Sequence, residues 1–175
     1  SSDEAAITTS FDGTEITIYG AIKRQAPTPQ DSPPEIAVPI EGPPRSVTIR
    51  RKSREFGIWV NTESVVVGSA PSFYAVATTG PIDVILTAEE DARNRISVPT
   101  VMRSFARPVA VADPVEFTGA MMAIRIADGT YQVDVGGVKL EDDTLFRADF
   151  RLPANLVEGA YKTRIFLLRD GRVID

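Results

Sequence analysis

Residues 56–81 constrain the fold of this 175-residue chain more than any other stretch. They hold the only tryptophan, Trp59, the valine run at 65–67 and the aromatic pair at 73–74. β-Branched and aromatic residues fit the pleated surface of a sheet, and the glycine and proline of residues 68–71 would interrupt such a run. The stretch therefore predicts two or three short buried strands in the core of a mainly β protein.

Residues 7–22 carry two alternating runs joined by an Asp-Gly dipeptide, which accepts the positive φ angles of a tight turn. We therefore expect a β-hairpin there. Proline-rich residues 26–34 lack backbone donors and predict an extended loop. Strands should follow at residues 36–40, where apolar side chains alternate, and from residue 47 onward.

The apolar period changes from 2 to 3.6 after residue 81. We expect an amphipathic helix over residues 82–96. A second helix should begin at Asp113-Pro114, which combines an N-cap with a first-turn proline, and end at Asp128-Gly129. Residues 97–107 between them are compatible with a short helix or a loop. The sequence thus predicts a helical insertion over residues 81–129.

Strand patterns return over residues 131–135, 144–152 and 161–168. In residues 144–152 apolar and charged side chains alternate, which indicates an antiparallel strand with one face in water. Residues 161–168 are apolar on both sides, so the helical insertion or a partner must cover this strand. Tyr161 follows a Leu-Val-Glu-Gly-Ala segment that resembles the corner of immunoglobulin-like sandwiches, where a tyrosine hydroxyl bonds to upstream backbone.

These patterns favour one immunoglobulin-like antiparallel β-sandwich, residues 1–175, with the helical insertion within it. Two small domains are the alternative that remains open. We prefer a single sandwich because residues 130–175 alone offer too few strands to bury a core.

Cysteine and histidine are both absent, which excludes thiol nucleophiles, Ser-His-Asp triads and most zinc and transition-metal sites. The net charge of −5 argues against a nucleic-acid partner. The acidic run at 141–143, near Asp134, lacks the spacing of a calcium loop and reads as a turn. We predict no catalytic, cofactor-binding or metal-binding residues; an enzyme that uses only carboxylates is the least favoured class.

The strongest electrostatic feature is a cluster of cations within ten residues: Arg45, Arg50, Arg51, Lys52 and Arg54. This candidate interaction surface suits anion binding, phospholipid headgroups or docking on an acidic partner. A solvated turn between strands is the simpler interpretation. In a regular strand Arg50 and Arg51 point to opposite faces, so the cluster cannot line one pocket.

The blocks FGIWVNT, PSFYAVATTGP and LPANLVEGAYKTRIFL resemble an alphaproteobacterial family of transmembrane proteins, and the resemblance covers nearly all of the chain. Members are expected to carry a secretion signal, an extracytoplasmic domain and one C-terminal transmembrane helix. The resemblance therefore implies a location at the periplasmic side of the bacterial inner membrane, with the anchor outside the 175 residues. It carries over no catalytic or ligand residues.

The resemblance also implies a partner, because such proteins are associated with exporters of the sulfite or organosulfur anion type. Together with the absence of chemistry-bearing residues, this favours a non-enzymatic accessory or interaction module beside a membrane transporter. The candidate contact surfaces are the segment from Arg45 to Arg54 and an exposed sheet edge or the helical insertion. A periplasmic module that binds or senses a small molecule or anion is the alternative.

Overall fold

The computed structural model describes residues 5–12, 15–22, 32–55, 58–105, 114–142, 144–154 and 156–175, and their side chains except at 5–12, 47–55, 58–68 and 114–118. An outer sheet contains, in order, β1 (Ala5–Asp12), β2 (Glu15–Ile22), β9 (Leu145–Arg151) and β8 (Val138–Glu141). A central sheet contains β12 (Arg172–Val173), β11 (Phe166–Arg169), β3 (Glu35–Glu41), β6 (Tyr74–Thr78) and β7 (Tyr131–Val135), and β10 (Lys162–Thr163) also pairs with β3. The third sheet pairs β4 (Pro44–Glu55) with β5 (Ile58–Pro71), and we call it the arm.

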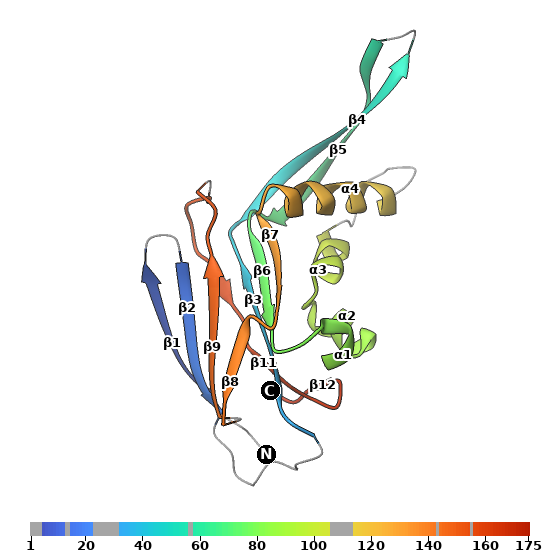
Figure 1. The fold of residues 1–175 in the computed structure, drawn as a ribbon. Coiled ribbons are helices and arrows are strands. Elements are labelled where there is room, and N and C mark those ends of the chain that lie inside the picture. The colour runs from blue at the N-terminus through green and yellow to red at the C-terminus, as the bar shows by residue number, and fades with distance from the viewer. Residues whose placement is uncertain are drawn as a thin grey trace.

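Four helices of the described chain lie between β6 and β7: α1 (Ile82–Ile85), α2 (Ala88–Asn94), α3 (Val98–Phe105) and α4 (Pro114–Ala127). The outer sheet, the central sheet and these helices form three successive layers (Figure 1). The mainly β fold with a helical insertion is therefore confirmed. The insertion connects two strands that pair in parallel, which only a long crossover permits.

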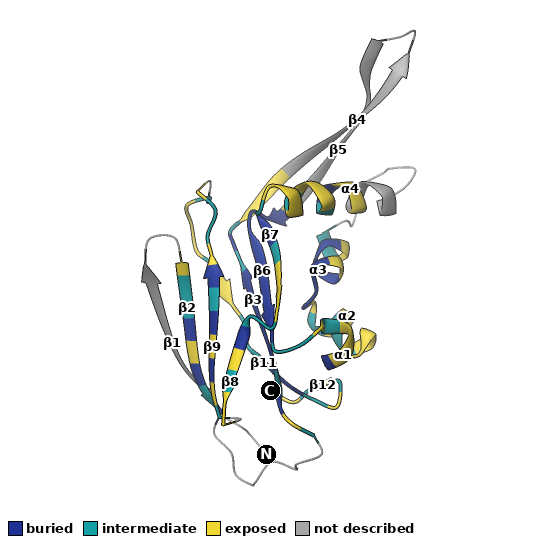
Figure 2. Cartoon of the chain, viewed as in Figure 1, coloured by how far each residue is buried: buried dark blue, intermediate teal, exposed yellow. Residues whose placement is uncertain are grey.

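Within the central sheet, β3 and β6 are buried on both faces, as Figure 2 shows, whereas β7 at the edge is exposed at three of its five positions. Tyr74 and Val76 of β6 face the helices, whereas Ala75 and Ala77 belong to the core beneath the outer sheet. This explains why residues 71–81 are apolar without alternation. The prediction that β11 is covered on both sides is also confirmed, because Leu167 packs in one core and Leu168 in the other.

The outer sheet follows the predicted pattern more closely. The hairpin of β1 and β2 pairs Ala5 with Ile22 and Asp12 with Glu15. In β9, exposed or half-buried charged positions alternate with buried Phe146, Ala148 and Phe150. The apolar side of this strand faces the core between the two sheets. The period-two pattern therefore predicted correctly which of its side chains are buried.

Phe146 also explains a glycine in the neighbouring strand. Gly20 pairs directly with Phe146, whose ring lies across the glycine: a Cβ built there would be 2.1 Å from the ring Cζ. The ring is buried between the sheets and is 3% exposed. It therefore has little room to withdraw.

Gly20→Ala should lower the free energy of unfolding by about 2 kcal/mol, because the added methyl overpacks the core against this ring. Urea denaturation measures the loss. Gly119→Ala in α4 is the matched control, since its Cβ would meet no atom within 4 Å and alanine favours a helix. Equal stability of Gly20→Ala and the parent would contradict the packing described here.

Four sequence-based expectations are wrong. Residues 56–81 hold two strands, as expected, but β5 is a single 14-residue strand of the arm and not a short strand of the core. The expected helix over 82–96 is two helices, because Leu86 is extended and the Thr87 side chain caps α2 by accepting from the Glu90 backbone N–H. The strand β8 was not predicted. The expected strand over 161–168 is divided into β10 and β11, with Arg164 between them donating its backbone N–H to Pro39 O at 3.0 Å.

Candidate functional site

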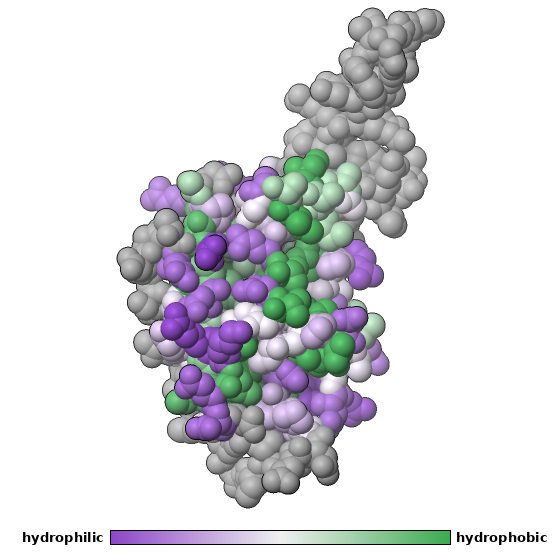
Figure 3. All heavy atoms as spheres, viewed as in Figure 1, coloured by the Kyte–Doolittle hydropathy of each residue, from purple (hydrophilic) through white to green (hydrophobic). Residues whose placement is uncertain are grey.

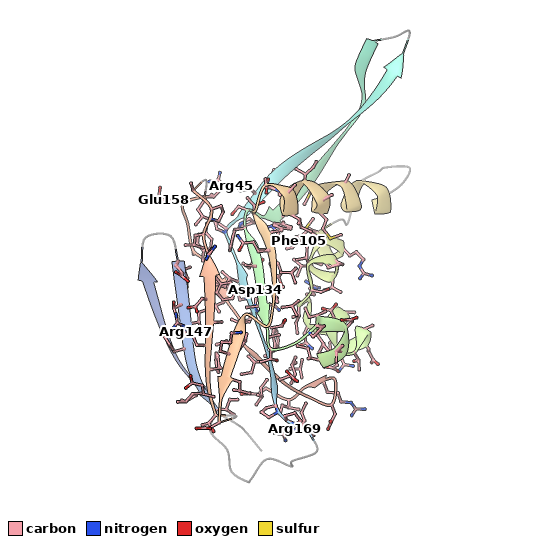
Figure 4. All side chains as sticks on the ribbon, viewed as in Figure 1. Arg45, Phe105, Asp134, Arg147, Glu158 and Arg169 are labelled. Atoms are coloured by element: carbon pink, nitrogen blue, oxygen red, sulfur yellow. The ribbon has the colours of Figure 1, made fainter. Side chains whose placement is uncertain are left out.

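The predicted basic surface lies on the arm. Arg45, Arg50, Arg51, Lys52 and Arg54 are all residues of β4. Among the described strands, β4 pairs with β5 alone, and the two extend away from the layered body past α4 (Figure 1). Arg45 is exposed at the base of the arm (Figure 4), whereas the side chains of the other four cations lie outside the described residues.

The register of the arm fixes where these cations stand along it. Arg50 pairs with Ser64 and Arg51 with Glu63. The register shifts between Arg51 and Lys52, so the pairing beyond this point is displaced. The extra residue at this shift is Thr62 of β5, so β4 itself runs on without an insertion through the basic segment.

The base of the arm is fixed to the central sheet. The Gly42 N–H donates to Phe73 O at 2.8 Å, and the Ser72 N–H donates to Pro43 O at 3.0 Å. From the opposite side, the buried Tyr131 hydroxyl donates to Pro71 O at 2.8 Å. These bonds join the arm to β3, β6 and β7, so the rigid body sets the direction in which the arm leaves it.

Tyr161 packs at the same base. Its hydroxyl donates to Val157 O at 2.8 Å, four residues upstream, and burial raises the pKa of this hydroxyl. Its ring centroid lies 6.2 Å from that of Phe73, and its Cε1 would be 3.0 Å from a Cβ on Gly42. The role of this corner is therefore to pack around the root of the arm.

A second exposed feature is apolar and lies beside the arm. Ile124 and Ile126 of α4 and Val133 and Val135 of β7 are 59, 51, 52 and 54% exposed. Figure 3 shows apolar side chains gathered over α4 and β7. In the described chain β7 is the terminal strand of the central sheet, so its outer edge is open to another strand. We call these four residues the apolar strip. The sequence suggested an exposed edge or the helical insertion as a contact surface, but did not identify β7 as the strand at that edge.

The outer sheet carries a shallow hollow of about 600 Å³ on its solvent side, lined in part by Tyr19, Lys139, Leu145 and Arg147. The Arg147 guanidinium lies 5.5 Å from the Tyr19 ring centroid (Arg147 is labelled in Figure 4). Arg147 Nε also lies 2.9 Å from Asp149 Oδ2, and this hydrogen bond raises the pKa of Arg147. Because Arg147 and Asp149 offset each other's charge, the hollow carries no concentrated charge. In the sequence, the alternation of β9 therefore indicated only a strand with one solvent-exposed face.

In the acidic run at 141–143, Glu141 lies at the end of β8 and Asp142 in the turn that leads to β9, as expected. Asp142 has a positive φ of 49°, and Asp143 lies outside the described residues. In the described part of the chain no three acidic side chains gather in a way that could hold a metal ion.

Comparison with known proteins gives one match. A family model described as "Putative transmembrane protein (Alph_Pro_TM)" matches residues 1–175. No curated protein and no solved structure matches the chain. Among the helices that the structure describes, none is both long and apolar enough to cross a membrane.

Proposed function

Because the chain belongs to this transmembrane protein family, we propose that it is the non-enzymatic periplasmic domain of a single-pass membrane protein. In this proposal it serves as an interaction module beside a membrane transporter, of the kind that exports sulfite or organosulfur anions. The anchor lies outside these 175 residues, and the domain faces the periplasmic side of the inner membrane.

The arm is the observation that carries the proposal. β4 is twelve residues long and pairs with β5 in a two-stranded ribbon that would span roughly 40 Å. A two-stranded ribbon on its own is marginally stable in water. Among the described contacts, this ribbon is fixed only at its base. Packing against another molecule would therefore stabilise it.

Charge indicates the chemistry of the partner surface. The chain has a net charge of −5, yet five cations stand on one strand of the arm. Complementary charge steers association and selects among partners. We therefore expect the arm to dock on an acidic periplasmic surface of a membrane protein, with the neighbouring apolar strip available to extend the contact.

The test is affinity purification of the full-length, membrane-anchored protein from its native membranes, followed by mass spectrometry. A transporter should be recovered in near-equal amount. Arg50→Glu together with Arg51→Glu should reduce its recovery about tenfold or more, since each reversal places like charges in contact. Arg50→Gln with Arg51→Gln should reduce the recovery of the transporter by an intermediate amount. This neutral pair also avoids placing a second carboxylate opposite Glu63, the residue that pairs with Arg51.

The matched control reverses two exposed cations of the body, Lys162 and Arg172, which changes the net charge equally. This control should leave the recovery unchanged. Recovery of the protein alone from wild-type membranes, or equal losses in the arm variants and the control, would contradict the proposal.

A further inference from the structure

A small hollow separates α2 and α3, far along the chain from the arm. It has a volume of about 250 Å³ and is lined by Ala92, Arg95, Thr100, Arg103 and Ser104. Ala92 lies on α2 and Arg95 caps its C-terminal end, whereas Arg103 and Ser104 follow Thr100 at three and four residues and so share one face of α3. Arg95 and Arg103 therefore line the same hollow.

Among the described residues that line this hollow there is no carboxylate, although α2 is rich in acidic residues. Glu89 and Glu90 both bind Arg93, at 3.0 and 2.8 Å. Glu90 also accepts from the Asn94 side chain. The local acidic side chains therefore have other partners, and the two arginines lining the hollow keep their charge unpaired by any described acid.

The Asp91 carboxylate is engaged by residues of the turn and of α3, including Thr100, which lines the hollow. Its carboxylate accepts from the Ser97 N–H at 2.7 Å and the Ser97 hydroxyl at 2.6 Å. It also accepts from the Thr100 hydroxyl at 3.0 Å. These bonds order the turn between α2 and α3 and so fix the spacing of the two walls.

Arg95 occupies a backbone position that usually belongs to glycine. It ends α2 with φ 53° and ψ 65°, in the left-handed region. Arg164 donates to the carbonyl oxygens of Asn94 and Arg95 at 2.6 and 2.7 Å, which satisfies the C-terminal end of the helix. An arginine retained where glycine is favoured points to a use for its side chain.

Arg103 is oriented as well. Its Nε donates to Pro99 O at 3.2 Å, and within the described chain its two Nη groups make no further hydrogen bond. The two Nη atoms carry four N–H groups in a fixed planar arrangement, which can donate paired hydrogen bonds to the oxygens of a planar or tetrahedral oxyanion. Two such guanidinium groups beside one hollow form a site for a negatively charged group.

We propose that the hollow between α2 and α3 binds a small oxyanion through the guanidinium groups of Arg95 and Arg103. The volume is below the usual range for larger organic ligands, so the ligand is an inorganic oxyanion or the oxyanion head of a short organic molecule. This site is separate from the arm, and the inference does not depend on the proposed docking function.

Isothermal titration calorimetry of the 175-residue chain at low ionic strength tests the site, with inorganic sulfate, inorganic phosphate and methanesulfonate as probes. We expect saturable binding of at least one of them. Arg95→Gly and Arg103→Gln should each raise Kd about tenfold or more, because each removes a charge-assisted hydrogen-bonding group. Binding of methanesulfonate would admit organic oxyanion heads, and binding of the inorganic ions alone would restrict the site to them; both results support the proposal.

Two comparisons separate binding from folding and from general surface charge. Arg95→Gly should also raise the melting temperature, because glycine relieves the left-handed backbone, so its loss of binding cannot follow from unfolding. Lys162→Gln, an exposed cation outside the hollow, should leave Kd unchanged. Absence of saturable binding for all three anions, or an equal loss in Lys162→Gln, would overturn the proposal.

Discussion

Alkaline conditions above about pH 10 are expected to unfold this protein, because two of its tyrosine hydroxyls are buried in the core between the central sheet and the helices. Tyr74 donates to Ile96 O at 2.6 Å, and Tyr131 donates to Pro71 O at 2.8 Å. Burial raises the pKa of Tyr131 to about 12 and that of Tyr74 further, the nearby Arg164 only partly opposing the shift at Tyr74. Both hydroxyls must therefore be neutral in the folded state.

The sign of the pH dependence follows from the raised pKa values. Below about pH 10 both phenols are neutral in the folded and unfolded states, and their contribution to stability is fully present. Above it the unfolded chain ionises first, which favours unfolding. Tyr131 alone should cost about 3 kcal/mol by pH 12, and Tyr74 adds to this loss.

Urea denaturation across pH 8 to about 12 measures this effect. The double variant Tyr74→Phe with Tyr131→Phe should start less stable at pH 8 but lose much less stability between pH 10 and 12. Tyr19→Phe is the control, because Tyr19 is 43% exposed on the outer sheet, and it should leave the alkaline loss unchanged. An unchanged loss in the double variant would assign alkaline unfolding to other groups.

Asp91→Ala should lower the free energy of unfolding by about 3 kcal/mol. The Asp91 carboxylate accepts from the backbone N–H groups of Ile96 and Ser97, at 3.2 and 2.7 Å, and from two hydroxyls on α3 and the turn before it. Ser97 and Thr100 are 8 and 9% exposed. Removing the carboxylate leaves these groups without a partner in a site that little water reaches.

Urea denaturation checks this prediction, with Glu89→Ala as the matched control on the same helix. The Glu89 side chain is 82% exposed and pairs only with Arg93 among its described contacts, so its removal should cost less than about 1 kcal/mol. Asp91→Asn retains one acceptor oxygen and should fall between the two. A loss in Asp91→Ala no larger than in Glu89→Ala would show that the turn between α2 and α3 is ordered by other contacts.

Much of the fold was predictable because it depends on local periodicity. The β1–β2 hairpin, the alternating strand β9 and the limits of α4 all follow from the spacing of apolar residues and from turn and cap residues a few positions apart. The cap of α2 was also present in the sequence, since Thr87 and Glu90 have capping-box spacing. It was overlooked because the apolar stripe over residues 82–96 continues across the break.

The functional surfaces were only partly predictable. The five cations of the arm were visible in the sequence, since they lie within ten residues of one another. The sequence did not show that these cations stand on a projecting ribbon, because a strand that leaves the body can carry the same kinds of residue as a strand in the core. The hollow between α2 and α3 gave no signal at all, since Arg95 and Arg103 resemble ordinary solvated side chains until two helices bring them together.

The sequence by itself therefore determined most of the strands and helices, and that the strand at residues 161–168 is apolar on both faces, because these properties depend on neighbouring residues. Only the tertiary structure decided that β6 and β7 pair in parallel, that the helices cover one face of the central sheet, and that β4 and β5 form an arm. The physical reason is that the hydrophobic free energy depends on how much apolar surface is removed from water and not on which segment covers it. Which segment covers which face therefore depends on how the whole chain packs together.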